Sequence, residues 1–483
     1  MKEGEVSSSA LTNRAPFQGN RPSWFHALVH TTPARFAILV FTSLVAIWTA
    51  LLALPISSAS GELTPLADAL FTAVSAICVT GLSTIDMATH WSLFGEIVIL
   101  LGIQIGGVGV LTIASLLGLT VTRRLGLRQR LLVASDTNPN RTARGASESQ
   151  AVGLGDIGGL LSAVAISLLV IEAGLTLLIT PRLMADGMDL WHALWNGFYL
   201  AASAFTNTGF VPLAGGLEPY LGDYYLLTVL ALGVFLGSIG FPVIFALYRY
   251  VVKGSEKRRH IGLHAKLTLA TTLVFVILGW LLITSLEWNN PATLGAEPVG
   301  RTLYDAWYMS IMTRSGGLGI IDPMEMNGST RLVIDMLMFV GGGSASTAGG
   351  IKVTTIAVLF LAAYAEARGY QDMQAFGRRI PTEVLRVAVS VLIWGATIVL
   401  ISTTAIMHIA GTTLDETLFE VISAFGTCGL STGLSEALPD AGKYVLAATM
   451  WAGRVGTVTL AAAVAATSRS RLFRFPEERP IVG

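Results

Sequence analysis

Long uncharged stretches recur along this chain and indicate its fold class. Each reaches about 20 residues or more, the length that a helix needs to cross the hydrocarbon core of a membrane. Buried helices of soluble proteins seldom run so far without a charge. The clearest stretches are Phe36–Leu54, Ile97–Thr122, Tyr224–Tyr248, Leu267–Leu286 and Val387–Leu414. The pattern predicts an all-α membrane protein.

Shorter apolar stretches lie between the long ones. Helical patterns are found at 66–77, 192–205, 302–312 and 415–425. With about a dozen residues each, these helices are too short to span a membrane. A glycine-containing segment follows every one of them. The sequence therefore predicts a repeating unit of span, short re-entrant helix, glycine segment and span.

The glycine segments resemble one another. They read SAICVTGLSTID (75–86), SAFTNTGFVPL (203–213), SIMTRSGGLGIID (310–322) and SAFGTCGLSTGL (423–434). A bulky apolar residue follows each central glycine, and an aromatic residue stands ten positions before it, namely Phe71, Tyr199, Trp307 and Phe419. Small residues are common at helix ends, but they do not explain agreement at several aligned positions. We expect four span–pore-helix–span repeats around one pseudo-fourfold pore, with eight transmembrane helices.

The segments between the apolar stretches fall into a basic class and an acidic class. Basic residues gather at 123–130, 249–259, 368–386 and 469–474, whereas the alternate segments are acid-rich. Basic loops stay in the cytoplasm, so a multi-pass protein of the cell membrane with both termini inside is expected. The first 35 residues are polar and do not resemble a signal peptide. The predicted boundaries are tail 1–35, repeats 36–123, 150–252, 265–366 and 386–468, and tail 469–483.

The glycine segments have the chemistry of a cation filter. A dehydrated cation needs oxygen ligands, and backbone carbonyls supply them without a trapping charge. Glycine allows the backbone dihedrals that turn carbonyls toward one axis. No acidic side chain stands at these positions, which disfavours divalent ions. The candidate ligands are Val79, Thr80, Gly81, Asn207, Thr208, Gly209, Ser315, Gly316, Gly317, Thr427, Cys428 and Gly429.

Three charged residues fall inside apolar sequence. Arg314 stands three residues before Gly317, and we expect it to point away from the filter toward an acid or carbonyl groups behind it. Arg454 lies within the last span. Because an intramembrane arginine is costly and usually functional, it is predicted to sit in the pore below the filter. Glu172 also lies within a span, and no transport role is assigned to it.

The stretch FVGGGSASTAGGIKVTT, residues 339–355, raises three interpretations. A phosphate-binding loop requires GxxxxGK[ST] after a strand, and the sequence around Lys352 does not fit. A flexible linker is disfavoured because both flanks are apolar. Glycine weakens a helix by about 1 kcal/mol per residue, so a broken membrane helix is expected to obstruct the pore. The predicted gate residues are Gly341, Gly342, Gly343, Ser344, Ala345, Ser346, Thr347, Ala348, Gly349, Gly350, Lys352 and Arg454.

Composition adds three points. Of all residues, 53% are hydrophobic and 13% are charged, whereas soluble proteins carry about 25% charged residues. The 31 basic and 31 acidic residues cancel, so nothing indicates a nucleic-acid partner. Seven scattered histidines and two cysteines argue against an enzyme and against a disulfide framework. We expect no cofactor in this chain and no resident metal besides the transported ion.

Together, the four filter glycines, the GGGSASTAGGIK loop and the GRVG arginine resemble the Trk/Ktr/HKT superfamily of potassium transporters over roughly residues 35 to 468. The Trk branch has an extra pair of N-terminal spans, whereas only about 35 polar residues precede the first span here. The sequence is therefore more similar to the Ktr membrane subunits, the KtrB type.

The resemblance implies a function and partners. It implies potassium selectivity, with the loop as an intramembrane gate that Arg454 contacts. Sodium-selective plant members carry serine where this chain has Gly81. Ktr-type relatives form homodimers in membrane lipid, on a cytoplasmic ring of RCK subunits that binds ATP or ADP. This chain lacks a dinucleotide fingerprint, so the regulator would be a separate polypeptide.

Two points stay open. Some relatives require sodium, and no residue here decides that question. The alternative is a sodium-selective or sodium-coupled cation carrier of the same architecture. The third filter usually reads TAGF in relatives, whereas this chain has Ser315, Gly316, Gly317 and Leu318. Weaker ion discrimination is expected at that segment.

Overall fold

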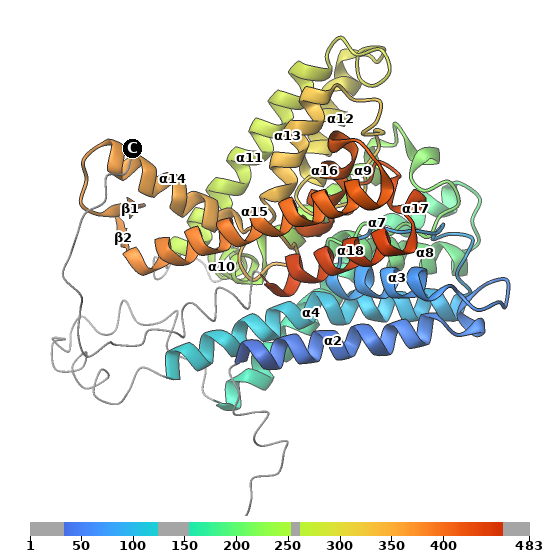
Figure 1. Ribbon diagram of the computed structural model, residues 1–483, viewed down its shortest axis with the longest axis horizontal. Coiled ribbons are helices and arrows are strands. Elements are labelled where there is room, and N and C mark those ends of the chain that lie inside the picture. The colour runs from blue at the N-terminus through green and yellow to red at the C-terminus, as the bar shows by residue number, and fades with distance from the viewer. Residues whose placement is uncertain (1–32, 124–153, 253–260, 457–483) are drawn as a thin grey trace, which may run out of the picture.

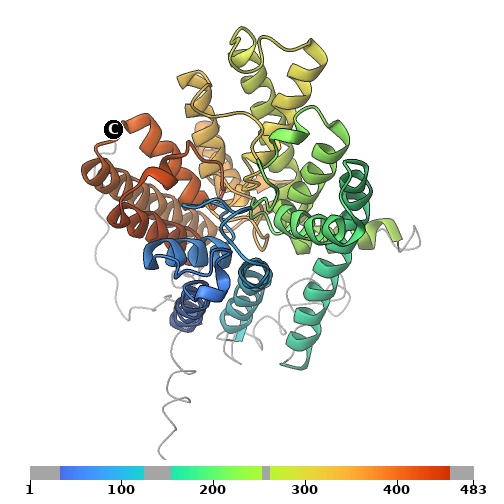
Figure 2. The ribbon, with the colours of Figure 1, turned by 90° about the vertical axis from the view of Figure 1, so that its right-hand side faces the viewer.

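The computed structural model describes residues 33–123, 154–252 and 261–456. The described chain is mostly helical, with one short hairpin. Viewed as in Figure 2, the blue, green, yellow and red parts of the chain occupy successive sectors around a centre where connecting loops converge. Most of the tail 1–35, all of the tail 469–483, and parts of repeats 2 and 4 lie outside the described residues.

The first repeat contains one short helix between two long ones. Helix α2 (Pro33–Leu52) is followed by a 3-10 turn, η1 (Pro55–Ser57). The short helix α3 (Leu66–Cys78) packs against α2 and against α4 (Leu93–Arg123). Although it contains a glycine-rich stretch, α4 remains helical throughout.

The second repeat departs from a straight second span. Its elements are α7 (Leu154–Ala185), the short α8 (Leu190–Phe205), η2 (Glu218–Tyr220), α9 (Tyr224–Ile239) and α10 (Phe241–Val252). Helices α9 and α10 meet at an angle of 103°. Gly240 has φ 84°, and Pro242 cannot donate a helical hydrogen bond. The apolar run Tyr224–Tyr248 is therefore two helices rather than one.

The third repeat has a second span that is broken in the middle. It contains α11 (Leu263–Glu287), the short α12 (Val299–Met312), α13 (Gly328–Phe339) and α14 (Val353–Ala367). The glycine-rich loop separates α13 from α14, so the predicted helix break is present. A hairpin of β1 (Met373–Ala375) and β2 (Arg378–Ile380) follows.

The described part of the fourth repeat ends in an unusual turn. It contains α15 (Thr382–Ala410), the short α16 (Leu414–Gly426), α17 (Leu434–Ala437) and α18 (Asp440–Trp451). A π-helical turn, η3 (Ala452–Gly456), follows and carries Arg454. Such turns are frequent at functional sites.

Several helices can cross a membrane. Within the described residues, Val164–Ala185, Leu263–Glu287 and Thr382–Ala410 are long and apolar enough, and the bent pair α9–α10 would make a fourth span. Shorter apolar stretches of helix are found at Ile38–Leu52, Leu66–Cys78, Leu93–Gly109 and Val353–Ala367. The chain therefore has the apolar helices of a multi-pass membrane protein, while the count of eight spans stays a prediction.

The four short helices lie in the interior. Of the aromatic residues ten positions before the filter glycines, Phe71, Tyr199 and Phe419 are at most 1% exposed, and Trp307 is partly buried. Long helices such as α2, α4 and α15 lie outside them (Figure 1). The arrangement places the C-terminal ends of the short helices near the centre of the molecule.

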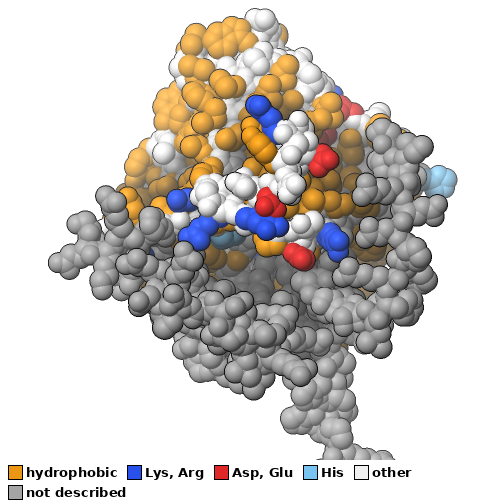
Figure 3. Space-filling model, turned by 90° about the vertical axis from the view of Figure 1, so that its left-hand side faces the viewer, with side chains coloured by type: hydrophobic (Ala, Val, Ile, Leu, Met, Phe, Trp, Pro, Cys, Tyr) orange, Lys and Arg blue, Asp and Glu red, His pale blue; other side chains and the backbone are white. Residues whose placement is uncertain are grey.

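Charged side chains gather at one end. The hairpin and the end of α14 lie on the left-hand side of Figure 1, which faces the viewer in Figure 3. There an apolar upper surface gives way to a region with Lys, Arg, Asp and Glu side chains. Exposed arginines of this segment are Arg368, Arg378, Arg379 and Arg386.

Candidate functional site

The four glycine segments share an unusual backbone conformation. In each segment, a non-glycine residue two positions before the glycine is left-handed, and so is the glycine. The non-glycine φ values are 58° at Val79, 61° at Asn207, 67° at Ser315 and 45° at Thr427. The glycine φ values are 90° at Gly81, 88° at Gly209, 69° at Gly317 and 93° at Gly429. Since this region is unfavourable for residues with a Cβ, its fourfold recurrence indicates one shared structure.

The four segments also meet in a closed ring. A Cβ on Gly81 would overlap the carbonyl oxygen of Thr208, and one on Gly209 would lie 2.7 Å from Cα of Gly317. A Cβ on Gly317 would lie 2.7 Å from the carbonyl oxygen of Cys428. The ring closes because a Cβ on Gly429 would overlap the carbonyl oxygen of Thr80. Each glycine thus faces the next repeat in cyclic order.

Hydrogen bonds to the short helices support three segments in the same way. The N–H groups of Thr80, Thr208 and Cys428 each donate to a serine carbonyl five residues earlier, at 2.8 Å. In the third segment the N–H of Gly316 instead donates to the carbonyl of Met312 at 2.8 Å. The third segment, with Ser315 and Gly316, is therefore supported differently from the other three.

Two buried carboxylates hold the outer ends of the filter segments, and sequence reasoning missed them. Glu420 is 0% exposed and accepts hydrogen bonds from Ser431, Thr432 and Ser435, which follow the fourth glycine. Asp68 accepts from the Thr84 hydroxyl and the Lys443 ammonium, both at 2.6 Å. In the sequence, the available signal was a single acidic residue in the apolar part of each of these short helices.

Arg314 bonds to a backbone carbonyl, one of the two kinds of partner expected for it. Its side chain is buried, and one terminal nitrogen donates to the carbonyl oxygen of Val340 at 2.9 Å. The guanidinium also lies 5.0 Å from the centroid of the Phe275 ring. A backbone carbonyl rather than an acid is therefore its hydrogen-bond partner.

Glycines in the second spans bring those helices against the filter segments. A Cβ on Gly106, Gly237 or Gly453 would overlap the carbonyl oxygen of Ile77, Phe205 or Phe425, respectively. Each of these carbonyls stands four residues before a filter glycine. Because only glycine allows this approach, the recurring motif fixes the second spans of repeats 1, 2 and 4 beside the ring.

The third repeat has a closed loop at the corresponding level. The base of the loop is a bridge between Val340 and Ile351, and the N–H of Gly341 donates to the Ile351 carbonyl at 2.9 Å. The N–H of Gly343 donates to the carbonyl of Ser238 in α9 at 2.7 Å. The loop therefore reaches across to the bent second span of repeat 2.

The loop also touches the filter segments. The hydroxyl of Thr347 lies 2.8 Å from Oδ1 of Asn207, and the N–H of Gly349 donates to Oγ of Ser315 at 3.4 Å. A Cβ on Gly349 would overlap the side chain of Thr427. The loop is packed directly against three of the four segments of the ring.

Two cations bind carbonyl groups of the loop. Arg454 is 2% exposed; it donates to the carbonyl of Thr347 and, at 3.4 Å, to that of Gly106. The ammonium of Lys352 lies 2.5 Å from the Ala348 carbonyl oxygen. The structure thus brings together the residues expected to form a gate, while their gating role stays a prediction.

Glu172 lies apart from this assembly. Its side chain is 0% exposed and accepts a hydrogen bond from Nε2 of Gln104 at 2.7 Å. The bond joins α7 of the second repeat to α4 of the first. This contact is a structural link between repeats, so no transport role follows from it.

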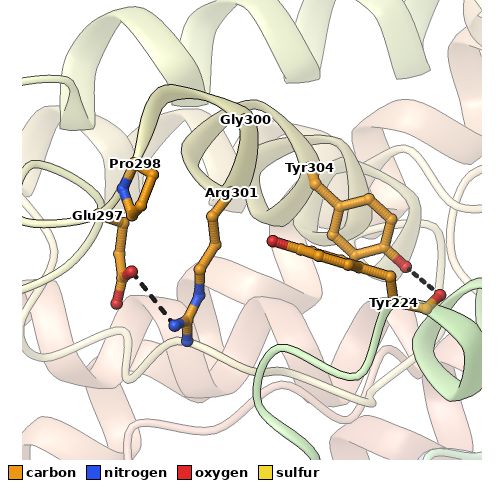
Figure 4. A pocket seen from close by; sticks show the side chains of 6 residues that line it. All are labelled: Tyr224, Glu297, Pro298, Gly300, Arg301 and Tyr304. Atoms are coloured by element: carbon orange, nitrogen blue, oxygen red, sulfur yellow. Dashed lines mark hydrogen bonds and ion pairs between the residues drawn. The ribbon is translucent and has the colours of Figure 1, made fainter.

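A surface hollow lies at the other end of α12. It is lined by Tyr224, Glu297, Pro298, Gly300, Arg301 and Tyr304 (Figure 4). Arg301 forms a 3.2 Å ion pair with Glu297, and the Tyr304 hydroxyl donates to the Tyr224 carbonyl at 3.0 Å. Since the filter follows the C-terminal end of α12, this hollow is separate from the ring.

Comparisons with known proteins agree over most of the chain. Residues 20–471 match the TrkH family, described as a cation transport protein. The chain is 32% identical over 457 residues to the Ktr system potassium uptake protein B of Bacillus subtilis (strain 168), covering 94% of this chain and 98% of that protein. It is 31% identical over 474 residues to the potassium/sodium uptake protein NtpJ of Enterococcus hirae, with coverages of 94% and 97%.

A solved structure has the same fold. The crystal structure of the potassium transporter TrkH from Vibrio parahaemolyticus superposes with a TM-score of 0.61 at 17% identity, covering 88% of this chain and 84% of that one. These relatives are named as transport proteins rather than enzymes. Because the family match spans all of the described helices, the chain belongs to the TrkH family of cation transport proteins.

Proposed function

We propose that this protein takes up potassium across the cell membrane through the ring formed by Gly81, Gly209, Gly317 and Gly429. The cyclic contact of the four segments is the observation that carries the proposal. No acidic side chain belongs to the proposed filter residues. Backbone carbonyls can replace the hydration shell of a monovalent cation and still release it.

The short helices strengthen this proposal. Helix α3 ends at Cys78 and α16 ends at Gly426, so their C-terminal ends adjoin the filter segments. The C-terminal end of a helix carries a partial negative charge. Four such ends around one centre would stabilise a cation there without a carboxylate in the path.

We further propose that the loop Gly341–Gly350 is the gate, with Lys352 and Arg454 holding it closed. Contact of the loop with the filter segments and the bonds of both cations to loop carbonyls support this role. Arg454 also places a buried positive charge beside the path, which opposes passage of a cation.

Control by a separate cytoplasmic RCK ring that binds ATP or ADP is also part of the proposal, as is a homodimer in membrane lipid with both termini cytoplasmic. Support comes from relatives that are named as components of a Ktr system. The exposed arginines near the hairpin, Arg368, Arg378, Arg379 and Arg386, provide a charged surface for such a partner.

The alternative is a sodium-selective or sodium-coupled cation carrier of the same architecture. The name of NtpJ, a potassium/sodium uptake protein, favours keeping this alternative. Glycine at position 81, where sodium-selective plant relatives have serine, favours potassium. Competition between the two ions in uptake assays separates the two functions.

Growth at low potassium tests the proposed function. A bacterial strain without its own potassium uptake systems should grow at low external potassium when it expresses this protein with its cognate regulator. Absence of rescue, with the protein present in the membrane, would contradict the proposal. Growth inhibition by added sodium, together with sodium accumulation, would favour the alternative.

A further inference from the structure

Three of the four left-handed non-glycine residues in the ring also contact the loop. They are Asn207, Ser315 and Thr427, which stand two positions before the glycines of repeats 2, 3 and 4. Residues in this conformation are strained and persist only where their surroundings hold them. The loop supplies part of those surroundings.

Asn207 bonds to the loop through its side-chain oxygen. The Thr347 hydroxyl lies 2.8 Å from Oδ1 of Asn207 and 3.2 Å from the Phe205 carbonyl oxygen. The side-chain nitrogen Nδ2 of Asn207 donates to the carbonyls of Val234 at 3.2 Å and Arg314 at 3.3 Å. One loop hydroxyl therefore orients a side chain that joins the second filter segment to the third.

Ser315 forms the second connection. Its hydroxyl oxygen accepts the N–H of Gly349 at 3.4 Å, and its proton is donated to the carbonyl of Thr427. A loop N–H is thus linked through one hydroxyl to the left-handed residue of the fourth segment. The loop and segments 2, 3 and 4 form one hydrogen-bonded network.

The left-handed residue of the first segment has no polar side chain that could join this network. That residue is Val79, which packs against α4 near Gly106. The first segment is therefore supported by a helix, whereas the others depend in part on the loop. Movement of the loop would remove support from one side of the ring.

We propose that Thr347 is a positioning residue that couples the gate to the ion affinity of the filter. In the closed state the loop holds the carbonyl ring in the shape that binds potassium tightly. When the loop withdraws, Asn207 and Ser315 lose their loop partners, and the ring binds the ion more weakly. Weaker binding assists conduction, because an ion must also leave its site. This coupling rests on the proposed potassium function.

The coupling is reciprocal. If loop position changes potassium affinity, then potassium in the filter must favour the closed loop by the same factor. A loop that only blocks the path would have no such effect on equilibrium binding. Binding measurements on the purified full chain therefore distinguish coupling from simple obstruction.

The test is a potassium titration in which the thermal unfolding midpoint is measured at each potassium concentration. A sodium titration is carried out in parallel. Thr347→Val keeps the side-chain volume but removes the hydroxyl, so the potassium concentration for half-maximal stabilisation should rise roughly threefold to tenfold, the size expected for one hydrogen bond. Thr347→Ser retains the hydroxyl and should restore the affinity to within about twofold.

Thr268→Val is the matched control. Thr268 is 0% exposed, packs against the loop near Gly343, and has a hydroxyl without a hydrogen-bond partner among the described residues. The potassium affinity of the Thr268→Val protein should equal that of the unaltered protein. Ser315→Ala removes the partner of the Gly349 N–H, and it should shift the potassium affinity in the same direction as Thr347→Val. It therefore provides a second test if the Thr347→Val protein folds poorly.

Two results would overturn the coupling alone. One is an unchanged potassium affinity in folded Thr347→Val and Ser315→Ala proteins, with faster flux. The other is an equal loss of affinity in Thr347→Ser and Thr347→Val. Failure of the unaltered protein to bind potassium would instead overturn the proposed function, and the coupling with it.

Discussion

Each filter glycine is required for two separate physical reasons. Its φ is positive, which disfavours any residue with a Cβ, and the neighbouring segment leaves no room for one. Gly81 shows both effects, since a Cβ there would overlap the Thr208 carbonyl. A side chain at these positions must therefore displace the carbonyls that are proposed to bind the ion.

Gly81→Ser and Gly317→Ser should lower potassium-over-sodium discrimination. Forcing a Cβ into the left-handed region costs about 1–2 kcal/mol, and relief of that strain would rotate the adjacent carbonyls. We expect a loss of about tenfold in the ratio of potassium to sodium flux. Measurement of both fluxes with isotopes in the same cells checks this expectation.

Gly411→Ser provides the control. Gly411 ends α15 with φ 68°, but nothing lies within 4 Å of a Cβ placed on it. The control carries similar backbone strain far from the ring and should keep the ion ratio. Unchanged discrimination in both filter variants would refute the filter assignment.

At the residue scale, the sequence predicted the roles of some buried charged residues but not of others. The role of Arg314 followed from an electrostatic argument, because a cation facing the path would repel the substrate, and the Val340 carbonyl is indeed its partner. Glu420 and Asp68 could not be assigned in this way. Ser435 reaches Glu420 only after the fourth segment has turned back on α16, and Lys443 reaches Asp68 only after the fourth repeat has packed against the first.

At the scale of elements, the sequence predicted the short helices well. The expected stretches 66–77 and 415–425 correspond to Leu66–Cys78 and Leu414–Gly426. It did not predict the bend of 103° between α9 and α10. Similar glycine motifs occur in α4, which stays helical, and Pro242 was the residue that distinguished the two cases.

The hairpin after α14 was also missed. Its strands have three residues each, too few to show a two-residue alternation. The turn at Phe376 and Gly377, with φ values of 50° and 73°, holds the strands together. A short ladder of this kind becomes evident only from its backbone pairing.

Deletion of Gly342–Gly349 should raise potassium flux severalfold. The ends of the loop are already joined by the bridge between Val340 and Ile351, so the deletion can be closed without separating α13 from α14. The deletion removes Thr347 and Gly349, which lie against Asn207 and Thr427 and are proposed to obstruct the path. Potassium efflux from vesicles that contain the purified variant measures the effect.

Arg454→Ala should act in the same direction with a smaller effect, because it removes a bond to the Thr347 carbonyl and leaves the loop in place. Thermal unfolding establishes that both variants are folded. If the deletion leaves flux unchanged in folded protein, the loop is not the barrier.

At the scale of the whole molecule, a nearly fourfold ring of glycine segments is combined with unlike second spans. The first is continuous, the second bends at Gly240, the third opens into the loop and the fourth carries Arg454 in a π-helical turn. Fourfold similarity suits a cation that needs ligands from all sides. Asymmetry below the filter suits a gate, since one repeat can move while the other three support it.

Family membership and fold rest on different comparisons. Sequence identity of 32% over 94% of the chain relates it to a potassium uptake protein, whereas the TrkH structure at 17% identity supports the fold alone. Figure 2 shows successive parts of the chain arranged around one centre, while the division into four repeats stays a prediction. Packing between sectors, which forms the loop–filter network, depends on contacts more than 100 residues apart, such as that between Thr347 and Asn207.

Potassium flux through the purified protein in liposomes tests the central claim most directly. Potassium-loaded vesicles would be diluted into medium with sodium or potassium as the competing external ion, with and without the nucleotide-loaded regulatory partner. The proposed filter predicts that potassium crosses the membrane and that sodium does not cross in its place. It also predicts that the partner increases the potassium flux. Equal or preferred transport of sodium, or no flux of either ion in either condition, would contradict the account.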